Sequence, residues 1–339
     1  HNEDFINGSN GNASEHAVFK GPLGFSFDIR DTFAVPDIAR NAEMMNEAWQ
    51  RSQYACDVDG IVSVDPVFIQ KMVEINGNVT LENGTVLTSE NTAEYMLNTI
   101  YKEVPVSLQD TYFEYIASTI MNKAFSNMDI AKMMKVAQSI GELTKNRHFY
   151  AYTFHDDEAK YFQGAGLAKG TPDSETDPEV GIYLNEQNPS KLGWYIDRKA
   201  QITKTGQNAD GSKTYHVTYT LTNTLTSSEM ATCTGYILGG EQAGVTGKPV
   251  AAPGTSAQRM LFYAPKGGSI SEITSSGDVR DQSNAVMDDQ KLVTNVAYIA
   301  PGESVTFDFD VTTSPKAESD LTIDQTPSGK MTNEVNYQY

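Results

Sequence analysis

Hydrophobic residues in the first half of the chain recur at two spacings, one typical of strands and one typical of helices. Apolar residues return every three or four positions over residues 36–51, which predicts an amphipathic helix. The continuously apolar run 58–64 leads into Asp65, a natural N-cap, and Pro66, which suits the first helical turn. A buried strand that delivers a helix in this way is typical of an α/β domain, so we expect this fold class for the first half.

Further elements of the first half follow from the same periodicities. The alternation at 24–29 predicts a strand that ends at Arg30 and Asp31, and Asn83-Gly84 is the signature of a tight hairpin turn. Helical spacing predicts helices, and alternation a later strand, in this order: helices 88–101, 108–125 and 128–143, strand 148–154 and a short helix from 156. Strands that alternate with helices form a layered sheet with helices packed on it.

The helical spacing disappears beyond the Pro-, Ser- and acid-rich stretch 171–179, which is the best candidate linker. Short alternating runs with turn signals between them replace it, at 195–204, 215–225, 259–263, 292–299, 304–311 and 334–337. This pattern predicts an all-β antiparallel sandwich of the immunoglobulin-like kind. We therefore expect two domains, an α/β domain at 1–180 and a β-sandwich at 181–339.

Charge narrows the classes of partner. The chain has 44 acidic and 25 basic residues and a formal net charge of −19, which would repel a phosphate backbone, so we expect no nucleic-acid partner. No run approaches the roughly 20 apolar residues needed to span a bilayer, and the chain starts without Met or a signal peptide. We expect an N-terminally truncated extracellular protein, held at the cell surface by an anchor upstream of this chain.

Two cysteines, Cys56 and Cys233, leave two alternatives open. A disulfide between them would close a very long loop and stabilise the fold by roughly 5 kcal/mol. Otherwise they are two unrelated buried thiols. Neither has a Cys or His neighbour at the spacing of metal ligands, so we expect no metal site at either.

Several motifs resemble known families. The order of elements around 27–31, 42–49 and 58–79 resembles the LytR-CpsA-Psr family, extracellular enzymes that transfer polyprenyl-pyrophosphate-linked glycopolymers to peptidoglycan with Mg²⁺. The whole chain looks like the domain of unknown function 4012 family of actinobacterial surface proteins. That resemblance rests on residues 59–66, 87–91, 180–185, 190–192, 221–224 and 300–304.

The enzymatic resemblance implies a pyrophosphate site at Arg30 and Asp31, to which Asp28 could add a metal ligand. The other arginines of those enzymes are missing, because the corresponding helices carry none and no arginine lies between Arg51 and Arg147. Pyrophosphate is bound through paired guanidinium hydrogen bonds, which one arginine cannot supply. Alternatively, Arg30 and Asp31 are a structural ion pair at a strand end.

Three functions remain. We expect a cell-envelope protein, more a non-catalytic binder than an enzyme and without a cofactor, that binds cell-wall glycopolymer or a lipid-linked precursor or supports envelope assembly. One alternative is a divergent Mg²⁺-dependent phosphotransferase or hydrolase that uses Arg30, Asp31 and Asp28. The other is a surface adhesin that recognises its ligand through the β-sandwich.

Overall fold

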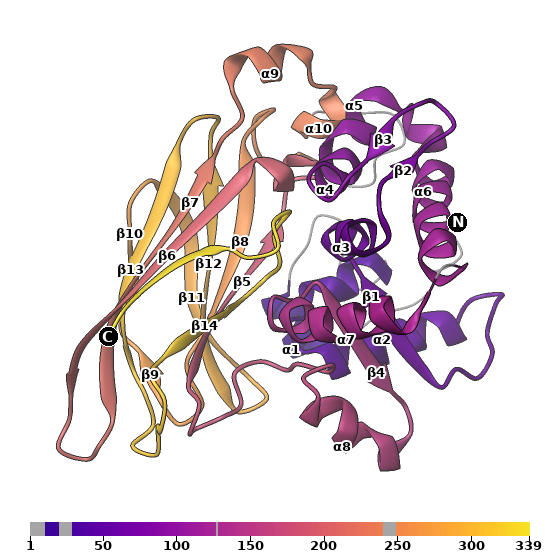
Figure 1. Ribbon diagram of the computed structural model, residues 1–339. Helices are drawn as coiled ribbons and strands as arrows, with labels where there is room; N and C mark the ends of the chain where they lie inside the picture. The colour runs from indigo at the N-terminus through magenta and orange to yellow at the C-terminus, as the bar shows by residue number, and fades with distance from the viewer. Residues whose placement is uncertain (1–10, 20–28, 127, 240–248) are drawn as a thin grey trace. The chain divides into compact units, whose positions relative to one another are not determined.

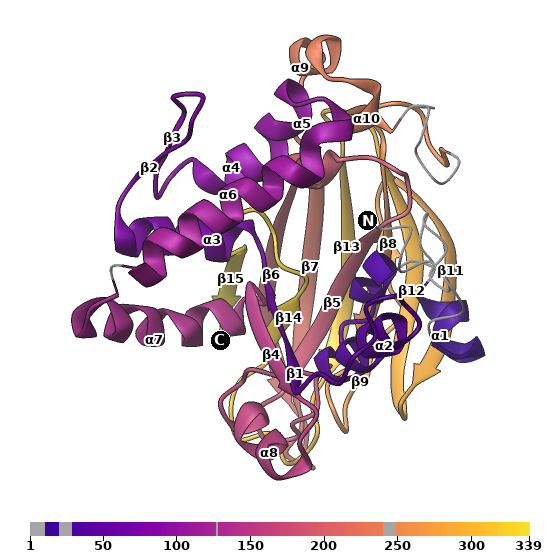
Figure 2. The ribbon, with the colours of Figure 1, turned by 90° about the vertical axis from the view of Figure 1, so that its right-hand side faces the viewer.

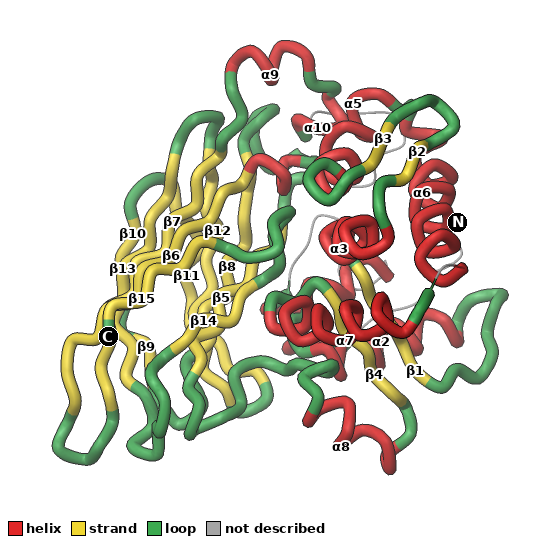
Figure 3. Tube along the Cα trace, viewed as in Figure 1, coloured by secondary structure: helices red, strands yellow, loops and turns green. Residues whose placement is uncertain are grey.

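A computed structural model describes residues 11–19, 29–126, 128–239 and 249–339. The chain divides into two compact units (Figure 1). The β-rich unit comprises His1–Asp57, Gly170–Thr326 and Asn333–Tyr339, and the helical unit comprises Val58–Lys169 and Pro327–Thr332. Figure 3 shows that strands dominate the first unit and helices the second. The predicted division at residues 180 and 181 therefore differs from the structure mainly in the first 57 residues.

Two sheets form the body of the β-rich unit. Among the described residues, one has six strands in the order β10-β13-β7-β6-β15, with β9 also paired to β13, and the other has five in the order β11-β12-β8-β5-β14. The first sheet consists of β6 (Ile196–Gln207), β7 (Lys213–Asn223), β9 (Ser269–Ile270), β10 (Thr274–Ser275), β13 (Ser304–Thr312) and β15 (Glu334–Gln338). The second consists of β5 (Glu179–Glu186), β8 (Ser256–Tyr263), β11 (Asp278–Met287), β12 (Gln290–Ile299) and β14 (Thr322–Gln325).

The pairing departs from the predicted all-antiparallel sandwich at two places. β14 pairs with β5 and β15 pairs with β6, both in parallel, whereas the other strand pairs of the two sheets are antiparallel. Short helical segments connect strands of this unit: η4 (Leu192–Tyr195), α9 (Ser227–Thr232) and α10 (Gly235–Leu238).

Alternation along the strands builds the core between the sheets. β7 buries Tyr215, Val217, Tyr219 and Leu221 completely, at every second position. Phe262 on β8 packs edge to face on two residues of β13, at 5.1 Å from Phe307 and 5.5 Å from Phe309 between ring centroids. These buried positions are the apolar ones of the alternating pattern predicted from the sequence.

The opposite face of the five-stranded sheet explains why the first 57 residues belong to the β-rich unit. They contribute α1 (Ala13–Val18), the 3₁₀ helix η2 (Ile29–Ala34) and α2 (Ile38–Gln50). Buried side chains of this N-terminal segment and of the sheet form one apolar cluster: Val18, Phe19, Val35, Met44, Tyr183, Leu261, Tyr263, Met287 and Leu292. The sequence pattern does not reveal this packing, because it shows which residues are apolar but not which distant strands they cover.

The helical unit is built around α3 (Pro66–Asn76). Its other elements are the strands β1 (Gly60–Val64), β2 (Val79–Thr80), β3 (Val86–Leu87) and β4 (Phe149–Thr153), and the helices α4 (Thr92–Glu94), the π-helical η3 (Tyr95–Thr99), α5 (Ile100–Glu103), α6 (Val106–Ser126), α7 (Ile130–Lys145) and α8 (Asp156–Gly164). The core includes Phe68, Val73, Ile100, Ile116 and Leu143. The predicted helices, hairpin and aromatic strand are thus present.

The predicted buried strand at 58–64 is wrong in its burial. Among the described residues, β1 pairs only with β4, antiparallel, in a two-stranded sheet, and the two strands lie side by side in Figure 2. Val62 is 66% exposed and Val64 43% exposed. A run of β-branched residues fits a strand whether or not its faces are covered, so the sequence identified the strand but not its partners.

Two further expectations concern the strand predicted at 24–29 and the two cysteines. Of the strand predicted at 24–29, residues 24–28 lie outside the described residues, and Ile29 begins the 3₁₀ helix η2. Of the two alternatives left open for Cys56 and Cys233, the structure shows free thiols and no disulfide between them, although neither thiol is fully buried. Cys56 is exposed after α2, whereas Cys233 follows α9 with its sulfur 3.7 Å from the Tyr195 hydroxyl.

The described structure combines helices with mixed and antiparallel sheets, which agrees with an α/β fold followed by a β-rich region. Within the described ranges, no helix has both the length and the hydropathy needed to cross a membrane.

Candidate functional site

Arg30 and Asp31, the predicted ligand residues, lie on η2. Arg30 is exposed, whereas Asp31 is only 8% exposed, so the two side chains occupy different environments. Asp28, the possible third member, lies outside the described residues. The role of this pair in binding stays a prediction.

Buried hydrogen bonds hold η2 in place. The Thr32 hydroxyl donates to the Ile29 carbonyl at 2.8 Å, and the buried Asn41 amide of α2 donates to the Thr32 carbonyl. Thr32 and Asn41 are almost fully buried. The turn that carries Arg30 is therefore fixed against α2 by side chains that need no ligand.

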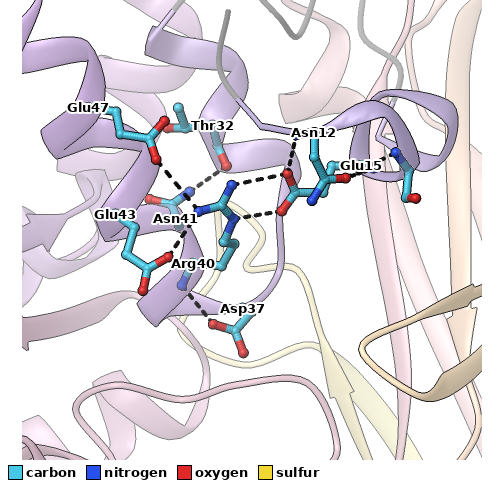
Figure 4. Close-up of polar contacts among 9 residues, drawn as sticks. Asn12, Glu15, Thr32, Asp37, Arg40, Asn41, Glu43 and Glu47 are labelled. Carbon is cyan, nitrogen blue, oxygen red and sulfur yellow. Dashed lines mark hydrogen bonds and ion pairs between the residues drawn. The ribbon is translucent and has the colours of Figure 1, made fainter.

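An arginine beside this turn forms a more complete charged cluster (Figure 4). Arg40 binds Glu15 through both sides of its guanidinium group, with Nε 2.6 Å from Oε1 and Nη2 3.1 Å from Oε2. Its Nη1 donates to Glu43 at 2.9 Å. Glu15 also completes the capping box of α1 by accepting from the Asn12 N–H at 2.6 Å.

The charges of the Arg40 cluster stabilise the contact between α1 and α2. Burial works to raise the pKa of Glu15, but hydrogen bonds from Arg40 and the Asn12 N–H outweigh it and hold that pKa below its ordinary value. The cavity beside the cluster, lined among others by Asp37 and Tyr263, has a volume of only about 10 Å³. That space holds about one water molecule, so this cavity is too small for a substrate, and the Arg40–Glu15 pair joins α2 to α1.

Other arginines are also engaged within the fold. Arg198 donates to the Thr326 carbonyl and Arg259 to the Val18 carbonyl, each at 2.6 Å, and Arg280 pairs with Asp278. In the parts of the chain that the structure describes, the arginines with these contacts serve four separate places. This distribution is unlike the convergent guanidinium groups that a pyrophosphate requires.

The acidic residues singled out in the sequence have mainly structural positions. Asp65 caps α3, as predicted, by accepting from the N–H groups of Val67 and Phe68 at 2.9 Å. Asp59 lies 3.0 Å from His155, which precedes the acidic first turn of α8. Over the described residues, no three His, Cys, Asp or Glu side chains are grouped so that they could hold a metal ion.

The β-rich unit contains a much larger cleft, which we call the sandwich groove. Its volume is about 530 Å³, within the range of small-molecule sites in proteins. It is lined by Phe262, Ala264, Ser269, Ile270, Asn284, Ala285, Val286, Lys291, Leu292 and Val293. These residues belong to β8, β11 and β12 of one sheet and to β9 of the other, with Ala264 just after β8.

The sandwich groove exists because β9 of the six-stranded sheet is much shorter than β11 and β12 of the five-stranded sheet. β9 has only two residues, which pair with β13 at Val311 and Thr312. It therefore covers little of β11 and β12, and Val286 remains 61% exposed. Phe262, in contrast, is fully buried, so the floor of the groove is continuous with the core of the sandwich.

The lining of the sandwich groove suits an amphipathic ligand. Most of its residues are apolar, and Lys291, Asn284 and Ser269 add an ammonium group, an amide and a hydroxyl. Lys291 is exposed, and among the described residues no carboxylate lies within ion-pair distance of its ammonium group. The groove can thus bury an apolar chain and offer one cation to an acidic group on it.

Sequence reasoning missed this groove. The strand at 278–287 was not predicted, because its apolar residues are few and a bulge between Arg280 and Ser283 interrupts their alternation. Lys291 carries no local motif. The groove is visible only when the two-residue strand β9 is compared with the ten-residue strands β11 and β12 of the other sheet. That comparison requires the sheet topology.

Comparison with known proteins gives a partial match to one family. Residues 7–101 match a family described as "Protein of unknown function (DUF4012)". The match covers less than a third of the chain, a shorter part than the motifs of the sequence had suggested. It includes α1, η2 and α2 as well as the first elements of the helical unit.

Other comparisons add little. One solved structure, that of a provisionally assigned nutrient binding protein from Legionella pneumophila, has 12% sequence identity and a TM-score of 0.21. The similarity covers 41% of this chain and 44% of that chain, less than half the length of that protein, and carries no argument about fold or function. No curated protein matches the sequence.

Proposed function

We propose that this chain is a non-catalytic binding protein of the cell envelope whose sandwich groove takes up the apolar part of an anionic, lipid-linked envelope precursor. The observation that carries the proposal is the groove of about 530 Å³ with one unengaged lysine among its apolar residues. Burial of apolar ligand surface would supply most of the affinity, at roughly 25 cal/mol per Å².

The places of the cationic side chains in the structure support binding rather than catalysis. Phosphoryl transfer requires several cations around the transferred group. Arg40, Arg198 and Arg259 are engaged with groups of the protein itself, whereas the groove provides a single ammonium group. One cation fits the recognition of a phosphate head group and falls short of what its transfer needs.

The proposal is tested with a prenyl chain that carries either a phosphate or a hydroxyl group. We expect geranylgeranyl phosphate to bind the purified 339-residue chain more tightly than geranylgeraniol, as measured by isothermal titration calorimetry. Val286→Asp should lower the affinity for both about tenfold, because it places a charge beside the apolar chain. Lys291→Gln should remove only the preference for the phosphate.

Controls separate the sandwich groove from the rest of the surface. Val250→Asp changes an equally apolar exposed residue of the β-rich unit outside the groove, and its affinity should equal that of the original chain. If neither compound binds, or if Val286→Asp binds like the original chain, the proposal is wrong. Loss of binding in Arg30→Ala alone would move the site to η2.

A further inference from the structure

Helix α7 presents an apolar stripe to solvent. Ile130 is 78% exposed, Met133 59% and Met134 58%, and the exposed Ala137 follows. These positions are spaced by three, four and seven residues, so they lie on one side of the helix. Exposed apolar residues are common when scattered singly, whereas a continuous stripe indicates an interaction surface.

The stripe is not needed for the fold of the helical unit. α7 packs on the core of that unit through a different side, with Leu143 fully buried and Val136 against the same cluster. Its first turn is capped independently, because the Asp129 carboxylate accepts from the Lys132 N–H at 2.8 Å. The helix is therefore anchored from one side, and the described residues leave the apolar stripe on its other side exposed.

Charge around the stripe runs opposite to that of the chain. Between Lys123 and Lys145 there are four lysines and two acidic residues, a local excess of two positive charges in a protein of net charge −19. Lys135 and Lys145 are exposed on α7 itself. Phe125, 66% exposed at the end of α6, precedes the same segment.

We propose that α7 is a docking surface for an anionic lipid bilayer and lies in the plane of that surface. Its 16 residues give a helix about 24 Å long, with apolar side chains on one side and lysines that can reach phosphate groups. A second copy of the chain fits less well. A contact between two α7 stripes would bring the lysines of the two helices, which have equal charge, close together.

Vesicle sedimentation tests the proposal with the 339-residue chain. We expect it to sediment with vesicles of equal parts phosphatidylglycerol and phosphatidylcholine at 50 mM salt, and much less with phosphatidylcholine alone. Ile130→Asp/Met134→Asp should lower the partition coefficient on anionic vesicles at least tenfold. Lys135→Glu/Lys145→Glu should remove the difference between the two vesicle types.

A matched control and the folding state make the result decisive. Val86→Asp/Val250→Asp adds the same two charges at exposed apolar residues outside α7 and should sediment like the original chain. Circular dichroism should show that all variants are folded, since every changed residue is exposed. Failure of the original chain to bind anionic vesicles overturns the proposal. So does a dimer in light scattering that only Ile130→Asp/Met134→Asp dissociates, which would assign the stripe to a second copy.

Discussion

Asp65 performs two structural tasks with one carboxylate. Its Oδ1 accepts the first N–H groups of α3, and its Oδ2 lies 2.7 Å from Nδ1 of the buried His148. The other ring nitrogen of His148 lies 3.0 Å from the Met331 carbonyl. A residue predicted as a helix cap thus also connects α3 to two later parts of the helical unit. The preference of Asp for N-cap positions does not predict these contacts, because it concerns only the start of the helix.

Glu186 has a carboxyl group with a strongly raised pKa in the β-rich unit. It accepts from the Ser256 hydroxyl at 2.6 Å, the Gln258 amide at 3.0 Å, and the N–H groups of Asn188 and Ala257 at 2.9 Å. Burial raises its pKa from 4.5 to about 7, and these hydrogen bonds oppose the increase without cancelling it. The group therefore titrates far above an ordinary glutamate.

This pKa predicts how stability changes with pH. Between pH 4.5 and 7 the folded state binds more protons than the unfolded state, so the free energy of unfolding should fall as the pH rises through this range. The fall attributable to Glu186 is about 3 kcal/mol at most. Glu186→Gln should remove this slope, although Gln offers only one acceptor and is expected to lower stability at every pH.

Urea unfolding of the β-rich unit at a series of pH values measures the slope. Glu272→Gln, at an exposed glutamate of the same unit, is the matched control and should keep the original slope. A Glu186→Gln profile parallel to that of the original chain would contradict the raised pKa.

At the scale of elements, the β1 and β4 pair depends on a glycine. A Cβ added at Gly60 would collide with the Tyr152 carbonyl oxygen, a backbone atom that cannot move alone. We therefore expect Gly60→Ala to destabilise the helical unit by roughly 1–3 kcal/mol. A shift of its thermal unfolding midpoint to lower temperature checks this prediction.

Gly141 on α7 provides the opposite case. A Cβ added there meets no atom within 4 Å, and the residue is exposed in a regular helix. Gly141→Ala should thus raise the stability of the same unit by about 0.5–1 kcal/mol, through the higher helix propensity of Ala. If Gly60→Ala and Gly141→Ala changed the stability of the helical unit in the same direction, steric conflict at Gly60 would not be the cause of its effect.

Elements with strong local signals were predictable from the sequence. The helices α2, α3, α6 and α7 and the hairpin at Asn83 and Gly84 follow from periodicity, caps and turn residues. The partners of these elements were not predictable. Burial of β1 was expected because its residues are apolar, yet whether a neighbour covers Val62 depends on packing between distant segments.

The candidate sites, like the packing partners of the elements, were only partly predictable from the sequence. Arg30 and Asp31 were identified by resemblance, and the structure places them on a turn with different exposure. The sandwich groove has no sequence signature, because its lining comes from four strands and its lysine is ordinary in context. A site made by the mismatch of two sheets is visible only once both sheets are known.

At the scale of the whole molecule, the net charge of −19 should oppose folding through self-repulsion. Raising the ionic strength from 0.01 to 0.15 M shortens the Debye length from about 30 to about 8 Å. We therefore expect the thermal unfolding midpoint to rise by a few degrees over this range. Differential scanning calorimetry at both salt concentrations checks the direction.

Salt has the opposite effect on the stability that ion pairs contribute. Arg40 with Glu15 and Lys204 with Asp320 would be weakened by the same salt. A midpoint that falls with ionic strength would mean that such pairs outweigh the repulsion among the excess acidic residues.

The parallel strands β14 and β15 have a consequence for synthesis on the ribosome. Each completes an edge of a different sheet, beside β5 and β6, and the segment between them, which includes Met331, belongs to the helical unit. All three contacts form only after residues beyond Thr322 have been translated. A shorter nascent chain would leave two strand edges unpaired, so we expect the β-rich unit to acquire its native state only after residues 322–338 have been translated.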